Sequence, residues 1–503
     1  MPRTPSGLSR RSMLLGSATA ALALTVPAKS AVARARAART PKVLVIGLDG
    51  ALLNRIKDAD APRLKALMAA GLTAPSAIYA NPMAPTMSGP GWSTLITGVW
   101  PDKHNVKDNN FTGHKFAQYP DFLTRIETAK PSLSTYAVSS WAPITDIVLS
   151  AKVDTRVSTP SAEYDTGTTA RAVERLKGAN PDAVFVQLDN VDHAGHTYGA
   201  ASQEYLDAIH GVDGQVGAMV DAVTSRSTYG NEDWLILVTA DHGHTDAGGH
   251  GGSTWPERQT FMIATGGTAA PGSTRHDVKM PDIAATALAH LGIALDPAWG
   301  LDGRPVQQPL PDDFDALRDR LGGPVDETGI GSGVIGFTHT PPSGWSVDNS
   351  RMGTGGVTEW RGWSFTTDEF WTKAERDQQR ECNVRARGVF AVADGDEWSD
   401  KTVTGTFDST LTSPAFPVTG GRPATLTYTT FYRQEAPQKG EVLVSYDGAA
   451  PVPVRTYTAD VPSRTETVPL TVPAGATSAK AHFRYTGANN WFWTIDGVKI
   501  SRS

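Results

Sequence analysis

Residues 42–50 read KVLVIGLDG, from Lys42 to Gly50, with six apolar or glycine residues before the acidic Asp49. An apolar run without alternation is typical of a strand that is buried on both faces of a parallel sheet. Ligands of such sheets bind beyond the carboxyl ends of the strands. The run therefore predicts an α/β domain and places Asp49 at the edge of the sheet where a functional site is expected.

Strands and helices alternate from residue 41 to about residue 306. Further strands are predicted at 133–139, 183–188, 234–239 and 261–265, and helices at 61–70, 161–176, 203–224 and 281–291. This alternation predicts a mostly parallel sheet with helices on both faces. Asp189 and Asp192 follow the strand 183–188, and Asp241 and His242 follow the strand 234–239. Acidic residues from three strands are therefore expected at one edge of the sheet.

Histidines gather behind two of these strands. Six of the twelve histidines lie between residues 193 and 250, and five of the six follow strand ends; His210, inside a predicted helix, is assigned a structural role. The motif Asp192-His193-Ala194-Gly195-His196 lets an Asp and a His four residues apart bind one ion. The segment 241–252, DHGHTDAGGHGG, adds Asp241, His242 and further histidines. Oxygen and nitrogen ligands without cysteine suit a catalytic zinc or a similar divalent metal.

Ser88 is the candidate nucleophile. It lies in the segment 85–98, PTMSGPGWSTLITG, where a helix is predicted to begin at Pro90 or Gly91. Free N–H groups and the dipole of a helix N-terminus favour a phosphate group there. Metal coordination can lower the pKa of a serine hydroxyl. The alternative interpretation is that Ser88 only caps the helix.

These motifs, in this order, resemble the alkaline phosphatase superfamily and, within it, the nucleotide pyrophosphatase/phosphodiesterase branch. The resemblance covers about residues 42–305. It rests on Asp49, the segment 85–98 with Pro101, Asp102 and His104 after it, Asp-x-x-Gly-His at 192–196 and Asp-His-Gly at 241–243. The branch commonly has threonine where this chain has Ser88, a difference that keeps the hydroxyl group.

The resemblance implies a set of roles for these residues. One metal ion would be held by Asp192, His196 and His250, and the other by Asp49, Asp241, His242 and the Ser88 oxygen. Asn109 would hold a non-bridging phosphate oxygen. His244 lies close enough in sequence to His250 to compete with it as a ligand, and His193 would lie beside the ligands.

The implied reaction is a two-step displacement through a phospho-serine, assisted by two divalent metal ions, with zinc favoured. A diester or pyrophosphate substrate is favoured over a monoester because Lys103, Lys107 and Lys115 are the only basic residues near Ser88 or Asn109 in sequence. A phosphomonoesterase and a non-catalytic secreted binding protein remain the alternatives. A sulfatase fits poorly, because Ser88-Gly-Pro-Gly-Trp92 lacks the arginine of the Cys/Ser-x-Pro-x-Arg motif.

Residues 1–39 predict a signal peptide, with Arg10 and Arg11 ahead of a short apolar run and small residues at the possible cleavage sites. The arginine pair resembles a twin-arginine signal, and a secreted or periplasmic protein is expected; an ordinary secretory signal or an uncleaved anchor is the alternative. The run is too short to span a bilayer. Without the seven basic residues of this segment, 39 basic residues remain against 52 acidic ones. This balance disfavours specific binding of nucleic acid.

The C-terminal part differs in composition. Residues 307–335 predict a linker, and residues 336–503, with short alternating stretches between turns, predict a β-sandwich. The segment 491–500, WFWTIDGVKI, weakly resembles jelly-roll domains of the MAM or carbohydrate-binding type. Six tryptophans could stack on a surface glycan or pack in the core: Trp345, Trp360, Trp363, Trp371, Trp491 and Trp493. Cys382, the only cysteine, excludes an internal disulfide and is expected to be a small apolar filler.

Overall fold

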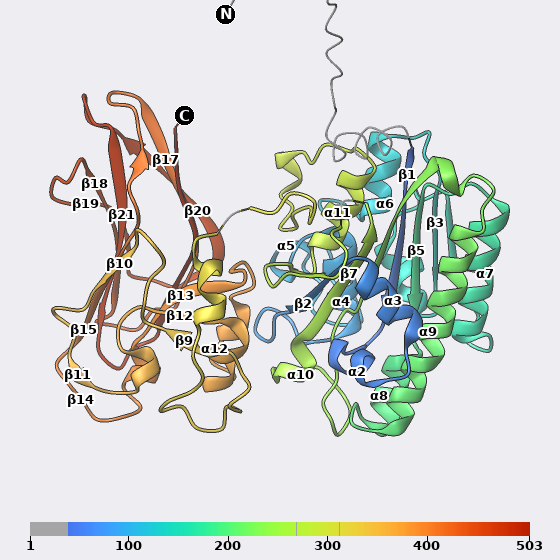
Figure 1. Cartoon of the computed structure of the whole chain (residues 1–503), viewed down its shortest axis with the longest axis horizontal. Helices are drawn as coiled ribbons and strands as arrows, with labels where there is room; N and C mark the ends of the chain where they lie inside the picture. The colour runs from blue at the N-terminus through green and yellow to red at the C-terminus, as the bar shows by residue number, and fades with distance from the viewer. Residues whose placement is uncertain (1–38, 268, 311, 503) are drawn as a thin grey trace, which may run out of the picture.

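The computed structural model describes residues 39–267, 269–310 and 312–502. The predicted signal peptide lies outside these residues, apart from Arg39. Figure 1 shows an α/β part formed by the first half of the chain, beside an all-β part formed by the second half. None of the helices in the described ranges is long and apolar enough to cross a membrane.

Eight strands form the sheet of the α/β part, in the order β4-β3-β5-β1-β6-β7-β2-β8. Their bounds are β1 Thr40–Leu48, β2 Leu72–Ala77, β3 Thr135–Ser139, β4 Thr155–Ser158, β5 Ala183–Leu188, β6 Glu232–Thr239, β7 Gln259–Gly266 and β8 Ser273–Thr274. The five strands from β4 to β6 are parallel, whereas β7 runs antiparallel to both β6 and β2. The prediction of a mostly parallel sheet is confirmed.

Strand β1 lies at the centre and pairs with β5 on one side and β6 on the other. Leu48 is level with Leu188, and Gly47 is level with Thr239. The residues that follow these three strands therefore leave the sheet side by side, which is what a shared site at this edge requires.

Helices cover both faces of the sheet, because successive side chains of β1 point to opposite sides. Leu44 and Ile46 pack in a core cluster with α3 (Pro62–Ala70), α7 (Tyr164–Gly178) and α9 (Gln203–Thr224). Val43 and Val45 pack in a second cluster with α4 (Ser88–Thr97), α6 (Phe122–Ala129) and α11 (Asp282–His290). The remaining α-helices of this part are α2 Leu53–Asp58, α5 Pro101–His104, α8 Asn190–Tyr198 and α10 Trp255–Arg258.

The all-β part contains two antiparallel sheets, as expected for a sandwich. One has the order β10-β15-β21-β18-β19, with β16 also paired to β21, and the other has the order β20-β17-β22-β13-β12-β9. The bounds are β9 Phe337–Thr338, β10 Ser346–Asp348, β12 Ser364–Thr367, β13 Val389–Asp394, β15 Phe407–Thr412, β16 Phe416–Pro417, β17 Pro423–Tyr432, β18 Lys439–Tyr446, β19 Val452–Tyr457, β20 Val461–Thr471, β21 Ser478–Gly487 and β22 Phe492–Arg502. Two further strands, β11 (Thr354–Gly355) and β14 (Val403–Thr404), pair with each other, and two helices, α12 (Asp368–Ala374) and α13 (Gly395–Trp398), complete this part.

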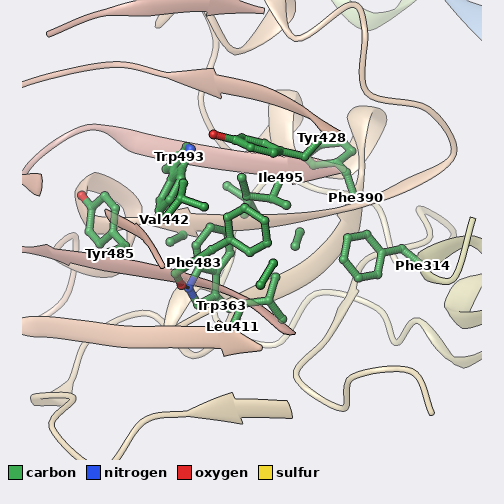
Figure 2. Close-up of a cluster of buried hydrophobic side chains, with 14 of the residues drawn as sticks. Phe314, Trp363, Phe390, Leu411, Tyr428, Val442, Phe483, Tyr485, Trp493 and Ile495 are labelled. Carbon is green, nitrogen blue, oxygen red and sulfur yellow. Dashed lines mark hydrogen bonds between the residues drawn. The ribbon is translucent and has the colours of Figure 1, made fainter. Parts of the chain in front are cut away.

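An aromatic core fills the space between the two sheets (Figure 2). The ring centroids of Trp363 and Trp493 lie 5.4 Å apart, and that of Phe483 lies 6.0 Å from Trp493. Five of the six tryptophans considered above for glycan stacking are buried here, namely Trp345, Trp360, Trp363, Trp371 and Trp493. The core interpretation therefore holds for these five. Only Trp491 is partly exposed, and the Arg433 guanidinium lies 3.5 Å from its ring centroid.

Buried polar contacts join the two parts. Arg258, 1% exposed, donates to the Ile78 carbonyl at 2.9 Å, to Thr372 Oγ1 at 3.0 Å and to Asp368 Oδ2 at 2.9 Å. Cys382 is a buried free cysteine whose Sγ lies 3.5 Å from the Ala80 carbonyl oxygen. A buried, fully paired arginine fixes the relative position of the elements that it joins.

The segment predicted as a linker contains a 3-10 helix, η4 (Phe314–Arg320). Its residues Phe314 and Leu317 are buried in the core cluster of the all-β part. The domain boundaries at residues 306 and 336 stay predictions.

Candidate metal-binding site

Three neighbouring strand ends supply the acidic and histidine side chains. Asp49 directly follows β1, and Asp241 and His242 follow β6. After β5, the chain enters α8, which carries Asp192 and His196 four residues apart and hence on one face of the helix. The order β5-β1-β6 in the sheet brings the three segments together.

Asp49 and Asp241 are buried, at 1% and 0% exposure. Asp49 Oδ2 accepts hydrogen bonds from Trp92 Nε1 at 2.8 Å and from Gln187 Nε2 at 3.1 Å, and Asp241 Oδ1 accepts from the Gly50 N–H at 3.2 Å. Their other oxygens, Asp49 Oδ1 and Asp241 Oδ2, are buried without a hydrogen-bond partner. Burial, followed by the charge of neighbouring carboxylates, raises the pKa of both side chains. Two such oxygens sealed from water fit a cation between them.

The imidazole of His242 lies beside these oxygens. Its Nε2 is 3.5 Å from Asp49 Oδ1, 3.3 Å from Asp241 Oδ2 and 3.2 Å from Ser88 Oγ. Its Nδ1 donates to the carbonyl oxygen of Gly243 at 3.1 Å. Burial, and then the neighbouring His250, lowers the pKa of His242. His242 is therefore a neutral imidazole with a free Nε2 lone pair, which is the metal-binding form.

Asp192 is surrounded by histidines. Its Oδ1 lies 2.7 Å from His244 Nε2 and 3.6 Å from His250 Nε2, and its Oδ2 lies 3.4 Å from His196 Nε2. Burial alone would raise the pKa of Asp192, but the hydrogen bond from His244 contributes to lowering it below its usual value. His250 Nδ1 donates to the Thr86 carbonyl at 2.5 Å, which leaves its Nε2 directed at His196, 3.0 Å away.

Two sets of ligand atoms are found at these strand ends, and within each set the atoms all lie within 4.8 Å of one another. One set comes from Asp192, His196, His244 and His250, and the other from Asp49, Asp192 and His242. Together with Asp241, these sets include all six Asp and His side chains that the sequence predicted as metal ligands, whereas Ser88 belongs to neither set. The structure adds His244 to the first set and places Asp192 in both. The donors are oxygen and nitrogen atoms, several of them buried and unpaired, and they fit divalent metal ions of the zinc type.

Ser88 is the first residue of α4 rather than a residue before it. The residue at the N-cap position is Met87, with no side-chain cap, and the first helical bond runs from the Gly91 N–H to the Met87 carbonyl. The predicted start at Pro90 or Gly91 is therefore too late, because a proline, which needs no N–H partner, fits within the first turn. The capping interpretation of Ser88 is wrong. Its hydroxyl, on a side chain only 8% exposed, faces His242 instead.

Asn109 is brought next to Ser88 by a hydrogen bond from the Gly89 N–H to Asn109 Oδ1, 2.7 Å long. A Cβ atom at Gly89 would lie 2.6 Å from the Asp108 carbonyl oxygen, so only glycine allows this approach. The bond uses one backbone N–H group of the helix N-terminus. The amide nitrogen of Asn109, an exposed residue, remains available to an external oxygen.

Three other polar residues near these strands have different roles. Asp189 accepts from the Tyr164 hydroxyl and from Gln187 Nε2, so its carboxylate is already engaged. His193 is exposed on α8, and His210, exposed on α9, has its Nδ1 2.7 Å from the Asp60 carbonyl oxygen.

Sequence reasoning missed the supporting residues Trp92 and Gln187, which both donate to Asp49 Oδ2. Gln187 offered a signal, because it is a polar residue inside the buried run of β5. Trp92 offered none, since a tryptophan in an apolar helix is equally explained by core packing.

A mostly parallel sheet whose strand ends gather carboxylates, histidines and one serine defines an α/β protein with a candidate metal-binding cluster beside a hydroxyl group. A model of the family "Type I phosphodiesterase / nucleotide pyrophosphatase" matches residues 43–133 and 128–389. The chain belongs to this family, within the alkaline phosphatase superfamily. The match extends past residue 305, where the resemblance of the sequence motifs ended.

Two curated mouse proteins are similar to this chain. Ectonucleotide pyrophosphatase/phosphodiesterase family member 7 of Mus musculus is 27% identical over 237 residues, which cover 41% of this chain and 51% of that protein. Family member 3 of Mus musculus is 23% identical over 223 residues, which cover 40% of this chain and 25% of that protein. The matched part of the chain spans about half of the length of family member 7 and a quarter of the length of family member 3.

Among solved structures, murine ectonucleotide pyrophosphatase/phosphodiesterase 5 aligns with 51% of this chain and 96% of its own, at 14% identity and a TM-score of 0.42.

Proposed function

We propose that this protein is a metal-dependent hydrolase of phosphodiester or pyrophosphate bonds in which Ser88 attacks phosphorus. One observation carries the proposal: the Ser88 hydroxyl, at the N-terminus of α4, lies 3.2 Å from His242 Nε2 and beside the unpaired oxygens of Asp49 and Asp241. Family membership supports phosphoester hydrolysis as the general activity. The serine and the phospho-serine intermediate are the finer part of the proposal.

Two divalent ions, with zinc favoured, are proposed at the cage formed by the Asp and His side chains at the strand ends. One would be held by Asp192, His196 and His250, and the other by Asp49, Asp241, His242 and Ser88. When bound, such ions lower the pKa of a coordinated hydroxyl and neutralise charge on a phosphate group. This ligand set is supported by the unpaired buried oxygens and by imidazoles whose Nδ1 atoms are engaged by backbone carbonyls.

The residues of the chain divide the remaining tasks. Ser88 Oγ forms the new bond to phosphorus while the bond from phosphorus to the leaving oxygen breaks, and water later releases the phosphoryl group from the serine. Asn109, fixed against Gly89, is positioned to donate to a non-bridging oxygen. Trp92 and Gln187 hold the Asp49 carboxylate in place. Positioning and charge neutralisation carry most of the catalysis in phosphoryl transfer.

A diester is favoured over a monoester because two of the three nearby lysines are engaged elsewhere. Lys103 Nζ donates to Asp302 Oδ1 at 2.8 Å and to the Gly300 carbonyl at 2.7 Å. Lys107 Nζ donates to the Met83 carbonyl. The doubly charged terminal phosphate of a monoester would lack the extra cation that these lysines could have supplied.

Export is part of the proposal. The predicted signal peptide supports a secreted or periplasmic location. So does the similarity to proteins named ectonucleotide pyrophosphatase/phosphodiesterase. Binding of a surface glycan by the all-β part is proposed at Trp491, which alone among the six tryptophans considered is partly exposed and which stacks with Arg433. We expect the full chain to bind cell-wall material and Trp491→Ala to bind it less. No binding by the wild type, or equal binding by the variant, would remove this part of the proposal.

The test compares hydrolysis of bis(p-nitrophenyl) phosphate and p-nitrophenyl phosphate by the purified full chain, with and without a chelator. We expect faster hydrolysis of the diester, loss of activity with the chelator and recovery on addition of zinc. Equal rates that are insensitive to chelator would overturn the proposal. No hydrolysis of either ester by metal-loaded protein would instead favour a binding protein.

A further inference from the structure

A hollow lies between the α/β part and the all-β part, apart from the candidate metal-binding site. Its volume is about 320 Å³, and none of the proposed metal ligands lines it. Its walls include α2 and β2 on one side and η4 and α12 on the other. The hollow is therefore distinct from the cage at the strand ends and is built by both parts of the chain.

Four basic side chains line this hollow: Lys57, His276, Lys279 and Arg318. Within the described ranges, none of their side chains forms a hydrogen bond or an ion pair with a carboxylate. Lys279 is only 7% exposed, and burial lowers its pKa. A cation removed from water without a direct acceptor costs free energy, so Lys279 is expected to have a partner that the chain does not supply. Lys57 is exposed, and burial lowers the pKa of His276 to about 4, so these two residues contribute less to this argument.

The acidic residues in the walls are already paired. Asp368 Oδ2 accepts from Arg258 Nη2 at 2.9 Å, and Glu369 Oε1 accepts from Lys373 Nζ at 2.7 Å. Asp368 also acts on Lys279, and Glu369 acts with Asp315 on Arg318, but neither wall residue forms a direct ion pair with these two cations.

Two further donors in the lining have no acceptor. Ser76 Oγ and Trp255 Nε1 are buried atoms without a hydrogen-bond partner. Buried polar atoms are normally satisfied, so such orphans indicate a missing ligand or water. Both orphans can donate, and so can the unpaired basic groups. An acceptor-rich, negatively charged ligand is the kind that such a lining would take.

We propose that this hollow binds a small oxyanion, such as inorganic phosphate, an organic phosphate or a polycarboxylate, with Lys279 and Arg318 as its charge partners. Its volume lies at the lower end of small-molecule sites, which run from about 300 to 1,000 Å³. Arg318 belongs to η4, which packs with the all-β core, whereas Lys279 precedes α11 of the α/β part. A bound anion would therefore link the two parts and stabilise their contact.

Titration calorimetry on the full chain tests the proposal after the metal has been removed with a chelator and the chelator removed by dialysis, because metal-free protein lacks the metal-dependent binding of phosphate at the cage. The probes are inorganic phosphate, pyrophosphate and citrate. We expect one equivalent of at least one probe to bind, and Ser88→Ala to leave this binding unchanged, which separates it from the proposed catalytic function. Phosphate-only or citrate-only binding identifies the chemical class of the ligand.

The decisive variants are Lys279→Met and Arg318→Met, with Lys177→Met as the matched control, because Lys177 is exposed on α7. Loss of a charged hydrogen-bond donor is expected to weaken binding about tenfold or more. Trp255→Phe removes one orphan donor without removing a charge, and we expect a smaller loss, so the proposal remains testable if a lysine variant fails to fold. Unchanged affinity in Lys279→Met and Arg318→Met, or no binding of any probe to the wild type, would overturn the proposal.

Discussion

Ser88 Oγ lies 3.2 Å from His242 Nε2, although the two residues are 154 positions apart in the sequence. Ser88 begins α4, and His242 follows β6, so the contact joins a helix N-terminus to the carboxyl end of a central strand. Burial, and then the neighbouring His250, lowers the pKa of His242, and its Nδ1 hydrogen bond to the Gly243 carbonyl leaves Nε2 as the atom that faces Ser88. The hydroxyl thus faces a lone pair that can accept its proton or share a metal ion with it.

The first prediction concerns this hydroxyl. Ser88→Ala removes the attacking oxygen, and we expect kcat for the diester to fall by about a thousandfold or more, as for other nucleophile deletions. Ser88→Thr keeps a hydroxyl at the same position, and activity within about tenfold of wild type is expected. Both are measured with metal-loaded protein of unchanged circular dichroism. Full activity in Ser88→Ala would exclude Ser88 as the nucleophile.

Much of the fold follows from periodicity in the sequence. The uninterrupted run before Asp49 identified the central strand, and the apolar face of residues 203–224 identified α9 with the bounds that the structure has. The antiparallel direction of β7 was not predictable, because a buried apolar run reads the same in either direction. The start of α4 was placed too late, since Pro90 and the glycines obscure a helix whose first turn is stabilised by its surroundings.

The candidate site was predictable to the extent that it depends on strand ends. Asp49, Asp192 and Asp241 each follow a strand, and β5, β1 and β6 are neighbours in the sheet. The contact of His244 with Asp192 depends on the path of the loop after β6, which sequence does not specify. Even the choice between His244 and His250 required the structure, and there both histidines approach Asp192 Oδ1.

The second prediction assigns His244 a positioning role. Its Nε2 lies 2.7 Å from Asp192 Oδ1, and its ring is fully buried. Loss of a group that orients a metal ligand typically costs about 10- to 100-fold in metal affinity. We therefore expect His244→Ala to weaken zinc binding by this factor, as measured by competition with a chromogenic chelator. His193→Ala is the matched control, because His193 is an exposed residue of α8 that belongs to neither ligand set. Equal affinities of the two variants would contradict the assignment.

The third prediction concerns the space around the His244 ring. A Cβ atom at Gly195 would lie 2.6 Å from His244 Cδ2, which is closer than real contacts allow. Gly195→Ala should therefore displace the ring and lower both zinc affinity and thermal stability. Gly211→Ala, in α9, meets no atom within 4 Å and is expected to raise the free energy of unfolding by up to about 1 kcal/mol. Chemical denaturation and zinc titration of both variants check this contrast, and equal effects would argue against crowding at His244.

The last prediction concerns His104, which lies under the helix that carries Ser88. His104 is fully buried; its Nδ1 accepts from the Val106 N–H at 3.1 Å, and its Nε2 lies 3.0 Å from Thr94 Oγ1 in α4. Burial, with a smaller contribution from the charge of Lys107, lowers the pKa of His104 to about 3. The neutral ring is therefore the form that the folded protein accommodates.

Because the pKa of His104 is lower in the folded state than the value of 6.5 expected in the unfolded chain, this residue favours folding above pH 6.5. That contribution is lost as the pH falls from 6.5 toward 3, since the unfolded chain then binds the extra proton. Between pH 7 and pH 5 the loss amounts to about 2 kcal/mol. Urea unfolding at the two pH values should show this difference in the wild type and a smaller one in His104→Asn. His114→Asn, at an exposed position, should retain the wild-type difference. If His104→Asn also retained it, the buried imidazole would not be the group that destabilises the protein in acid.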